Sequence, residues 1–114
     1  TNNRCELLAI ERALDIAAST HANQLRDGSH VLVIKTDSML CLNSLTKWRF
    51  KWELNRWIKG DGQPVKNKDL LARTGAKLDS DPLKGNVEFR HVKGHAGHHG
   101  NEQADRLASN AAKP

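Results

Sequence analysis

Apolar residues recur with a helical period at the start of the chain and at several points further along it. Leu7, Ile10, Leu14 and Ala17 are three or four positions apart, which predicts a helix over residues 3–19. The same criterion predicts further helices at about residues 38–45, 47–58, 68–78 and 101–112. Helices therefore account for most of the expected regular structure.

Two segments have the character of β-strands. Residues 31–34 form a Val-Leu-Val-Ile run bounded by polar residues, which is typical of a strand buried on both faces, and residues 87–92 alternate apolar and polar side chains. Because helices lie between these strands, we expect parallel pairing through a right-handed crossover. A stable sheet usually needs three or more strands. We therefore expect an upstream part of the sheet to lie outside this sequence or to come from another chain.

The 114 residues suffice for a single domain, and the charge within it is concentrated in one segment. Residues 46–68, here called the basic protrusion, contain seven Lys or Arg residues against two acidic residues, in a chain whose net charge is +5. A local basic patch predicts a phosphate-rich partner. The sequence has no apolar run long enough to span a membrane, so no membrane partner is expected. Cys5 and Cys41 lie in apolar-periodic contexts, and we expect reduced core thiols in an intracellular protein.

Three tryptophans are interleaved with the cations of the basic protrusion. Tryptophans at helical spacing usually pack in a core. Aromatic faces among cationic side chains are also suited to stacking on sugars or bases and to gripping phosphates. We favour binding for Trp48 and Trp52, next to Lys47 and Lys51, and core packing for Trp57.

Three carboxylates occupy positions suited to chemistry, and each has a structural alternative. Asp37 follows the buried strand, where open α/β sheets place ligand-contacting groups, or it caps the next helix. Glu6 lies in the first turn of the first helix, where its spacing from Asn3 is also that of a capping box. Asp105 is expected one turn into the last helix, and its alternative role is a solvated charge.

The segment before Asp105 combines glycines 94, 97 and 100 with three histidines. This much glycine suits a backbone that bends tightly. No cysteine is nearby, so a closed structural zinc site is not expected. His95 is the candidate for chemistry, whereas His98 and His99 are expected to be ordinary surface-loop residues.

Taken together, these features resemble the cellular type 1 ribonuclease H. The strings that carry the resemblance are Thr1-Asn2-Asn3-Arg4-x-Glu6, Thr36-Asp37-Ser38 and Lys93-Gly94-His95-Ala96-Gly97-His98-x-Gly100-Asn101-Glu102-x-Ala104-Asp105. The resemblance covers essentially the whole chain, including the basic protrusion. It implies an α/β, ribonuclease H-like fold that is incomplete here, with two parallel central strands, flanking helices and the upstream antiparallel strands absent. Residues 1–114 would then be a single, N-terminally truncated domain.

The resemblance implies endonucleolytic hydrolysis of the RNA strand of RNA–DNA hybrids by two Mg²⁺ ions, with Mn²⁺ as an alternative. By resemblance, Glu6, Asp37 and Asp105 match three of four catalytic metal ligands, and His95 matches a loop histidine that assists proton transfer or product release. The first catalytic aspartate of the family has no counterpart in this sequence, so we expect the chain alone to be incomplete as an enzyme. The alternative function is a non-catalytic hybrid-binding module that uses the basic protrusion.

The resemblance also implies a set of nucleic-acid contacts. Asn2 and Asn3 would approach the RNA strand, Met39 its minor-groove face, and Thr1 and Asn67 a DNA phosphate, while the first two tryptophans would line the channel for the DNA strand. The full implied set is Thr1, Asn2, Asn3, Met39, Lys47, Trp48, Lys51, Trp52 and Asn67. We expect a monomer, and the sequence does not distinguish nucleus, mitochondrion and cytoplasm.

Overall fold

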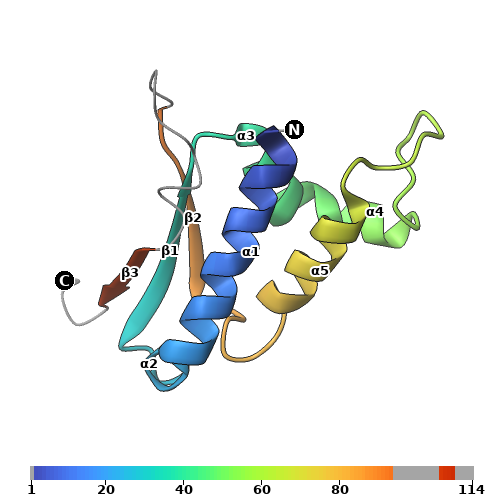
Figure 1. Ribbon diagram of the computed structural model, residues 1–114. Coiled ribbons are helices and arrows are strands. Elements are labelled where there is room, and N and C mark those ends of the chain that lie inside the picture. The colour runs from blue at the N-terminus through green and yellow to red at the C-terminus, as the bar shows by residue number, and fades with distance from the viewer. Residues whose placement is uncertain (1, 94–105, 110–114) are drawn as a thin grey trace.

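The computed structural model describes residues 2–93 and the backbone of residues 106–109. In chain order its elements are α1 (Asn2–Thr20), α2 (Ala22–Asp27), β1 (His30–Thr36), α3 (Met39–Asn43), the π-helix η1 (Ser44–Trp48), α4 (Arg49–Leu54), α5 (Lys68–Leu78), β2 (Val87–His91) and β3 (Arg106–Ser109) (Figure 1). Among these residues, no helix is both long and apolar enough to cross a membrane.

The sheet has the strand order β2-β1-β3, with β1 in the centre. β1 and β2 are parallel, in a register that pairs Leu32 with Val87 and Thr36 with His91. The predicted parallel pair of strands, flanked by helices in an α/β fold, is confirmed. Thr36 is the last residue of β1, and the carboxyl end of this strand lies near the start of α1 and of α3 (Figure 1). The candidate site lies at this end of the strand.

The predicted helix over residues 101–112 is wrong for the part that the structure describes. Residues 106–109 form β3, which is antiparallel to β1 and pairs Arg106 with Val33 and Ser109 with His30. The backbone N–H and C=O groups on the second edge of a central strand need partners. β3 supplies them, and this long-range pairing overrides the local helical period.

The core forms where the apolar side of α1 meets the sheet and α5. Leu7, Ile10 and Leu14 are buried with Leu32 of β1 and Leu70 of α5. Burying a side chain of this size typically contributes about 1.5–3 kcal/mol. This shared apolar contact is therefore the main interaction that positions the helices. Figure 1 shows α1 lying along the sheet with α5 beside it.

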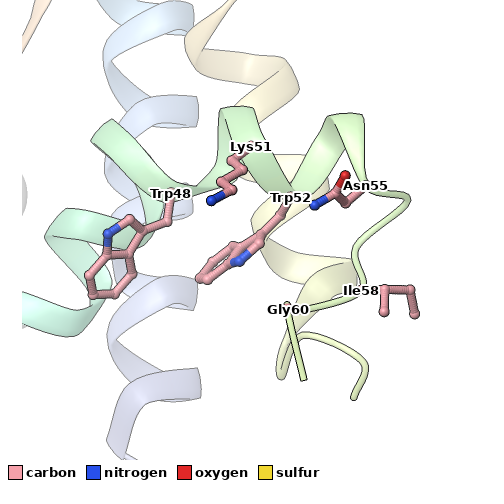
Figure 2. A pocket seen from close by; sticks show the side chains of 6 residues that line it. All are labelled: Trp48, Lys51, Trp52, Asn55, Ile58 and Gly60. Atoms are coloured by element: carbon pink, nitrogen blue, oxygen red, sulfur yellow. The ribbon is translucent and has the colours of Figure 1, made fainter. Parts of the chain in front are cut away.

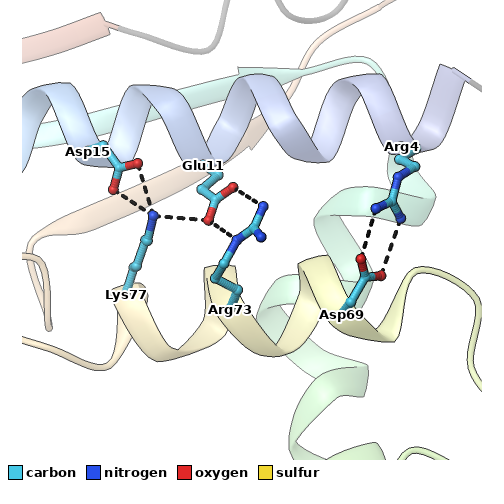
Figure 3. Close-up of polar contacts among 6 residues, drawn as sticks. All are labelled: Arg4, Glu11, Asp15, Asp69, Arg73 and Lys77. Carbon is cyan, nitrogen blue, oxygen red and sulfur yellow. Dashed lines mark hydrogen bonds and ion pairs between the residues drawn. The ribbon is translucent and has the colours of Figure 1, made fainter.

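Ion pairs line the seam between α1 and α5 on its solvent side (Figure 3). Glu11 accepts from Arg73 at 2.5 and 2.8 Å and pairs with Lys77 at 2.9 Å. Lys77 also pairs with Asp15 at 2.8 Å. These pairs join α1 to α5 in addition to their apolar contact.

The helix in the basic protrusion is shorter than predicted. It ends at Leu54 instead of residue 58, and the chain then turns through Arg56 and Trp57 with φ values of 55° and 63°. Positive φ is unfavourable for residues with a large side chain. The turn brings the Trp57 backbone N–H to the Trp52 carbonyl at 2.7 Å, which returns the chain toward the core.

Candidate active site and nucleic-acid groove

Glu6 is directed into the protein from the first turns of α1. Its side chain is only 6% exposed and accepts a hydrogen bond from the hydroxyl of Thr36, the last residue of β1. Burial raises the pKa of Glu6; the Thr36 hydroxyl opposes this shift, and the nearby charge of Asp37 adds to it. Because the carboxylate bonds to β1 instead of to the start of its own helix, the capping-box alternative for Glu6 is wrong.

Asp37 follows Thr36 at the end of β1 and is half-buried. The residue that caps α3 is Ser38, whose hydroxyl accepts from the Cys41 backbone N–H at 3.1 Å. The Ser38 backbone N–H in turn donates to the Thr36 hydroxyl oxygen at 3.1 Å. Asp37 is therefore not the helix cap, and its carboxylate is left for another role.

The charges of Glu6 and Asp37 interact, and carboxylate oxygens suit a divalent cation. Carboxylate oxygens are the donors that Mg²⁺ prefers, and one or two of them commonly suffice beside water and substrate phosphate. Glu6 and Asp37 repel each other electrostatically, and the polar groups described around Glu6 bring no positive charge to it. Among residues 2–93, no group of three or more His, Cys, Asp or Glu side chains could enclose a metal ion. Asp105 and His95 lie outside the described residues, so the described part of the site provides two oxygen donors.

A groove with a volume of about 700 Å³ is lined by Asn3 and Leu7, which flank Glu6 on α1, but not by Glu6 or Asp37 themselves. It passes between α1, the η1–α4 segment and the loop that leads into α5. Its polar and aromatic lining includes Asn3, Trp48, Trp52, Lys59, Lys66 and Asn67. Asn3, Trp48, Trp52 and Asn67 were predicted from the sequence, and the structure brings them together. Lys59 and Lys66 were not singled out, although both belong to the basic protrusion, whose charge was the available signal.

Asn67 is held in place at one end of the groove by a residue of α1. It has a φ of 61°, and its Oδ1 accepts from Arg4 Nη1 at 3.2 Å. Arg4 also forms an ion pair with Asp69 at 2.8 Å, which lowers the pKa of Asp69 to about 2 (Figure 3). Because its oxygen is engaged, Asn67 retains its amide N–H groups as donors for a ligand in the groove.

The three indole rings form a row. The ring centroids of Trp48 and Trp52 are 5.8 Å apart, and those of Trp52 and Trp57 are 6.4 Å apart. Trp57 is half-buried against the core, as predicted; Trp52 also packs there while lining the groove, and Trp48 is 40% exposed. A second hollow of about 370 Å³ lies beside Trp48 and Trp52 and includes Lys51 (Figure 2).

The remaining predicted contacts are not part of the groove lining that the structure describes. Asn2, Met39 and Lys47 are exposed, and none of them lines the groove. Thr1 lies outside the described residues, as do His98 and His99. Cys41 is a buried free thiol, as predicted, whereas the Cys5 thiol is exposed, so its placement in the core was wrong.

Comparison with known proteins shows the family of the chain. A family model described as RNase H matches residues 1–113. The ribonuclease H of Actinobacillus succinogenes is 38% identical over 113 residues, which are 99% of this chain and 65% of that protein. The ribonuclease H proteins of Vibrio cholerae serotype O1 (strain Classical Ogawa 395) and Treponema pallidum subsp. pallidum are 40% and 42% identical over 99% of this chain. The chain spans 64% and 60% of the lengths of those two relatives. Because the family model matches almost its whole length, the chain belongs to the ribonuclease H family.

Proposed function

We propose that this chain takes part in the endonucleolytic hydrolysis of the RNA strand of RNA–DNA hybrids, with two Mg²⁺ ions as cofactors. The observation that carries the proposal is the buried Glu6 carboxylate, which interacts with the Asp37 charge at the end of β1. Its neighbours on α1 line the same groove as Trp48 and Trp52. A carboxyl group whose pKa is raised by burial and by a neighbouring like charge is typical of catalytic centres.

In this proposal, Glu6 and Asp37 hold metal, and Thr36 orients Glu6 toward it through its hydroxyl. Bound magnesium supplies activation of the attacking water and stabilisation of the leaving oxygen. Asp105 supplies a further carboxylate, and His95 assists proton transfer or product release. The family's first aspartate would come from an upstream strand.

The groove would hold the DNA strand. Trp48 and Trp52 present ring faces to its sugars and bases, while Lys59 and Lys66 offset phosphate charge. The N–H groups of Asn67 donate to a phosphate oxygen. On the other strand, Asn2, Asn3 and Met39 would meet the wide minor groove, whose 2′-hydroxyls distinguish RNA from DNA.

The direct test measures cleavage of a hybrid with an end-labelled RNA strand in Mg²⁺. The chain is assayed alone and joined to the upstream segment of one of the relatives named above. RNA-strand cleavage by the fusion that EDTA abolishes, with no cleavage of duplex DNA, is the expected result. A fusion that is folded, as judged by cooperative unfolding, but leaves the hybrid intact would sink the proposal.

One observation favours a second candidate, a non-catalytic hybrid-binding module. The described part of the chain contains a continuous groove with aromatic and cationic lining but only two of the expected metal ligands. This candidate predicts binding that weakens with salt and with Trp52→Ala, without cleavage in Mg²⁺ by either the chain or the fusion. RNA cleavage by the fusion would reject it.

A further inference from the structure

The helix that carries Trp48 and Trp52 contains a π-turn, and the Arg49 side chain completes it. In η1 the Arg49 backbone N–H donates to the carbonyl of Ser44, five residues earlier. An α-helix would pair this N–H with the carbonyl of Leu45. The Leu45 carbonyl instead accepts from Nε of Arg49 at 2.7 Å. The side chain thus occupies the hydrogen-bonding position that the π-turn removes from its own backbone.

The rest of the Arg49 guanidinium ties this helix to α5. Its Nη2 and Nη1 atoms donate to the Asp79 carboxylate, just after α5, at 2.8 and 2.9 Å, and Nη1 lies 3.3 Å from Glu53. The guanidinium crosses α5 at Gly75, where a Cβ atom would lie only 2.8 Å from Nη1. Gly75 is therefore the residue that gives this arginine its space.

Arg49 differs from the other cations of the basic protrusion because it is only 3% exposed. Lys47 and Lys51, its neighbours two positions away, are both exposed. A phosphate in solution can reach those lysines but not a guanidinium that is already bonded to a carboxylate and a carbonyl. Any effect of Arg49 on a ligand must pass through the structure that it holds.

The π-turn matters because it sets the direction of the side chains that follow it. One extra residue in a helical turn rotates everything downstream by about 100° relative to a continuous α-helix. Trp52 is downstream of the π-turn and lines the groove together with Trp48. Figure 2 shows the two rings on the same side of the helix. Because residues four apart lie on one face of an α-helix, a return to an α-helical register would keep the two rings together but rotate both relative to α3, whose residues Leu40 and Cys41 also line the groove.

We propose that Arg49 is a positioning residue for nucleic-acid binding, which holds the π-turn and clamps α4 to α5 so that Trp48 and Trp52 face the groove together. The predicted effect of Arg49 on nucleic-acid binding rests on the proposed function. The predicted effect of Arg49 on the placement of the two rings does not. Arg49, Gly75 and Asp79 act as one unit in this arrangement.

Three variants test the unit. Arg49→Met keeps the length of the side chain but removes its donors, and Gly75→Ala leaves Arg49 unchanged while filling its space with a methyl group. Arg73→Met is the matched control, because it removes the arginine that pairs with Glu11 on the opposite side of α5, away from the tryptophans. For each variant, urea unfolding gives stability, near-ultraviolet circular dichroism reports the indole pair, and fluorescence anisotropy gives the affinity for an RNA–DNA hybrid in Ca²⁺ without Mg²⁺.

We expect Arg49→Met and Gly75→Ala to change the near-ultraviolet spectrum of the indoles in the same way. Each should weaken hybrid binding roughly tenfold, which is about the effect of removing one aromatic ring that stacks on a base. Arg73→Met should lower stability while leaving the spectrum and the affinity unchanged. An indole spectrum unaltered in both Arg49→Met and Gly75→Ala, or altered equally by Arg73→Met, would overturn the proposal. If the unmodified chain binds no hybrid, the hybrid-binding part of the proposed function fails for the chain alone, and the spectra still decide the role of Arg49. If Arg49→Met does not fold, Gly75→Ala alone decides it.

Discussion

Two glutamates on α1, five residues apart, are equally buried but differ in electrostatic environment. Glu6 and Glu11 are each 6% exposed. The pKa of Glu6 is raised, first by burial, whereas the pKa of Glu11 is lowered, first by its hydrogen bond from Arg73. Glu11 also accepts from Lys77, but the partner of Glu6 is the neutral hydroxyl of Thr36.

The difference shows which of the two buried charges serves the fold. A buried charge is costly unless it is paired and hydrogen-bonded. Glu11 meets that requirement within the protein and joins two helices. Glu6 does not, and the nearby Asp37 makes its ionisation less favourable. A divalent cation would relieve both effects, so we interpret Glu6 as a residue retained for function at a cost to stability.

Glu6 and Glu11 should differ most in their effect on catalysis. In the fusion with upstream strands, Asp37→Asn and Glu6→Gln should each reduce RNA cleavage roughly a thousandfold, because each removes charge that stabilises the reacting centre. Hybrid affinity should change little, since the groove is unaltered. Glu11→Gln, assayed in parallel with the same labelled hybrid, should retain activity. Unchanged turnover in Asp37→Asn would remove the metal-ligand assignment.

The sequence predicted the elements whose pattern is set locally. α1, β1, α5 and β2 agree with their apolar periods to within a few residues, because each buries one regular face or run. The short helix α2 and the strand β3 were missed. β3 forms because the edge of β1 provides backbone partners from far along the chain, which no local period records.

The site shows the same division. Asp37 was identified by its place after a buried strand, and Glu6 by a motif. The burial of Glu6 could also have been predicted, since Glu6, Ile10 and Ala17 share one side of α1, a side that is buried. Arg49 could not, because its charge matched that of its exposed neighbours and its partner Asp79 lies 30 residues away.

Stability should distinguish the two glutamates by sign. Glu11→Gln should lower the free energy of unfolding by about 1–2 kcal/mol at neutral pH, since it weakens charged hydrogen bonds to Arg73 and Lys77. Glu6→Gln should raise it by up to about 1 kcal/mol, because a neutral amide replaces a buried, unpaired charge. Urea unfolding without divalent cations measures both. A loss of stability in Glu6→Gln equal to that in Glu11→Gln would mean that Glu6 is also a structural residue.

The pH dependence of stability should divide at the ordinary glutamate pKa of about 4.3. The folded protein keeps the Glu6 proton at pH values where the unfolded chain has released it, so stability falls as pH rises from that value through the raised pKa of Glu6. Glu11 acts in the opposite sense, and its contribution is lost as pH falls from that value through its lowered pKa. Urea titrations at a series of pH values measure this dependence. Glu6→Gln should reduce the change of stability with pH above the ordinary glutamate pKa, and Glu11→Gln should reduce the change below it. If Glu6→Gln acted below that pKa and Glu11→Gln above it, the assignment of Glu6 to function and Glu11 to the fold would be reversed.

The smallest expected effect is the response of thermal stability to Mg²⁺. A cation that binds the folded carboxylates stabilises by about 1 kcal/mol when its concentration is roughly five times the dissociation constant. The melting temperature of the unmodified chain should therefore rise by a few degrees, as should that of Glu11→Gln, whose site is intact. Glu6→Gln and Asp37→Asn should show no rise in calorimetry with MgCl₂, relative to NaCl of equal ionic strength. Because Glu6→Gln is expected to be the more stable protein without the metal, addition of Mg²⁺ should narrow the gap between it and the unmodified chain. A gap that stays constant would show that the charge on Glu6 is not there to bind a cation.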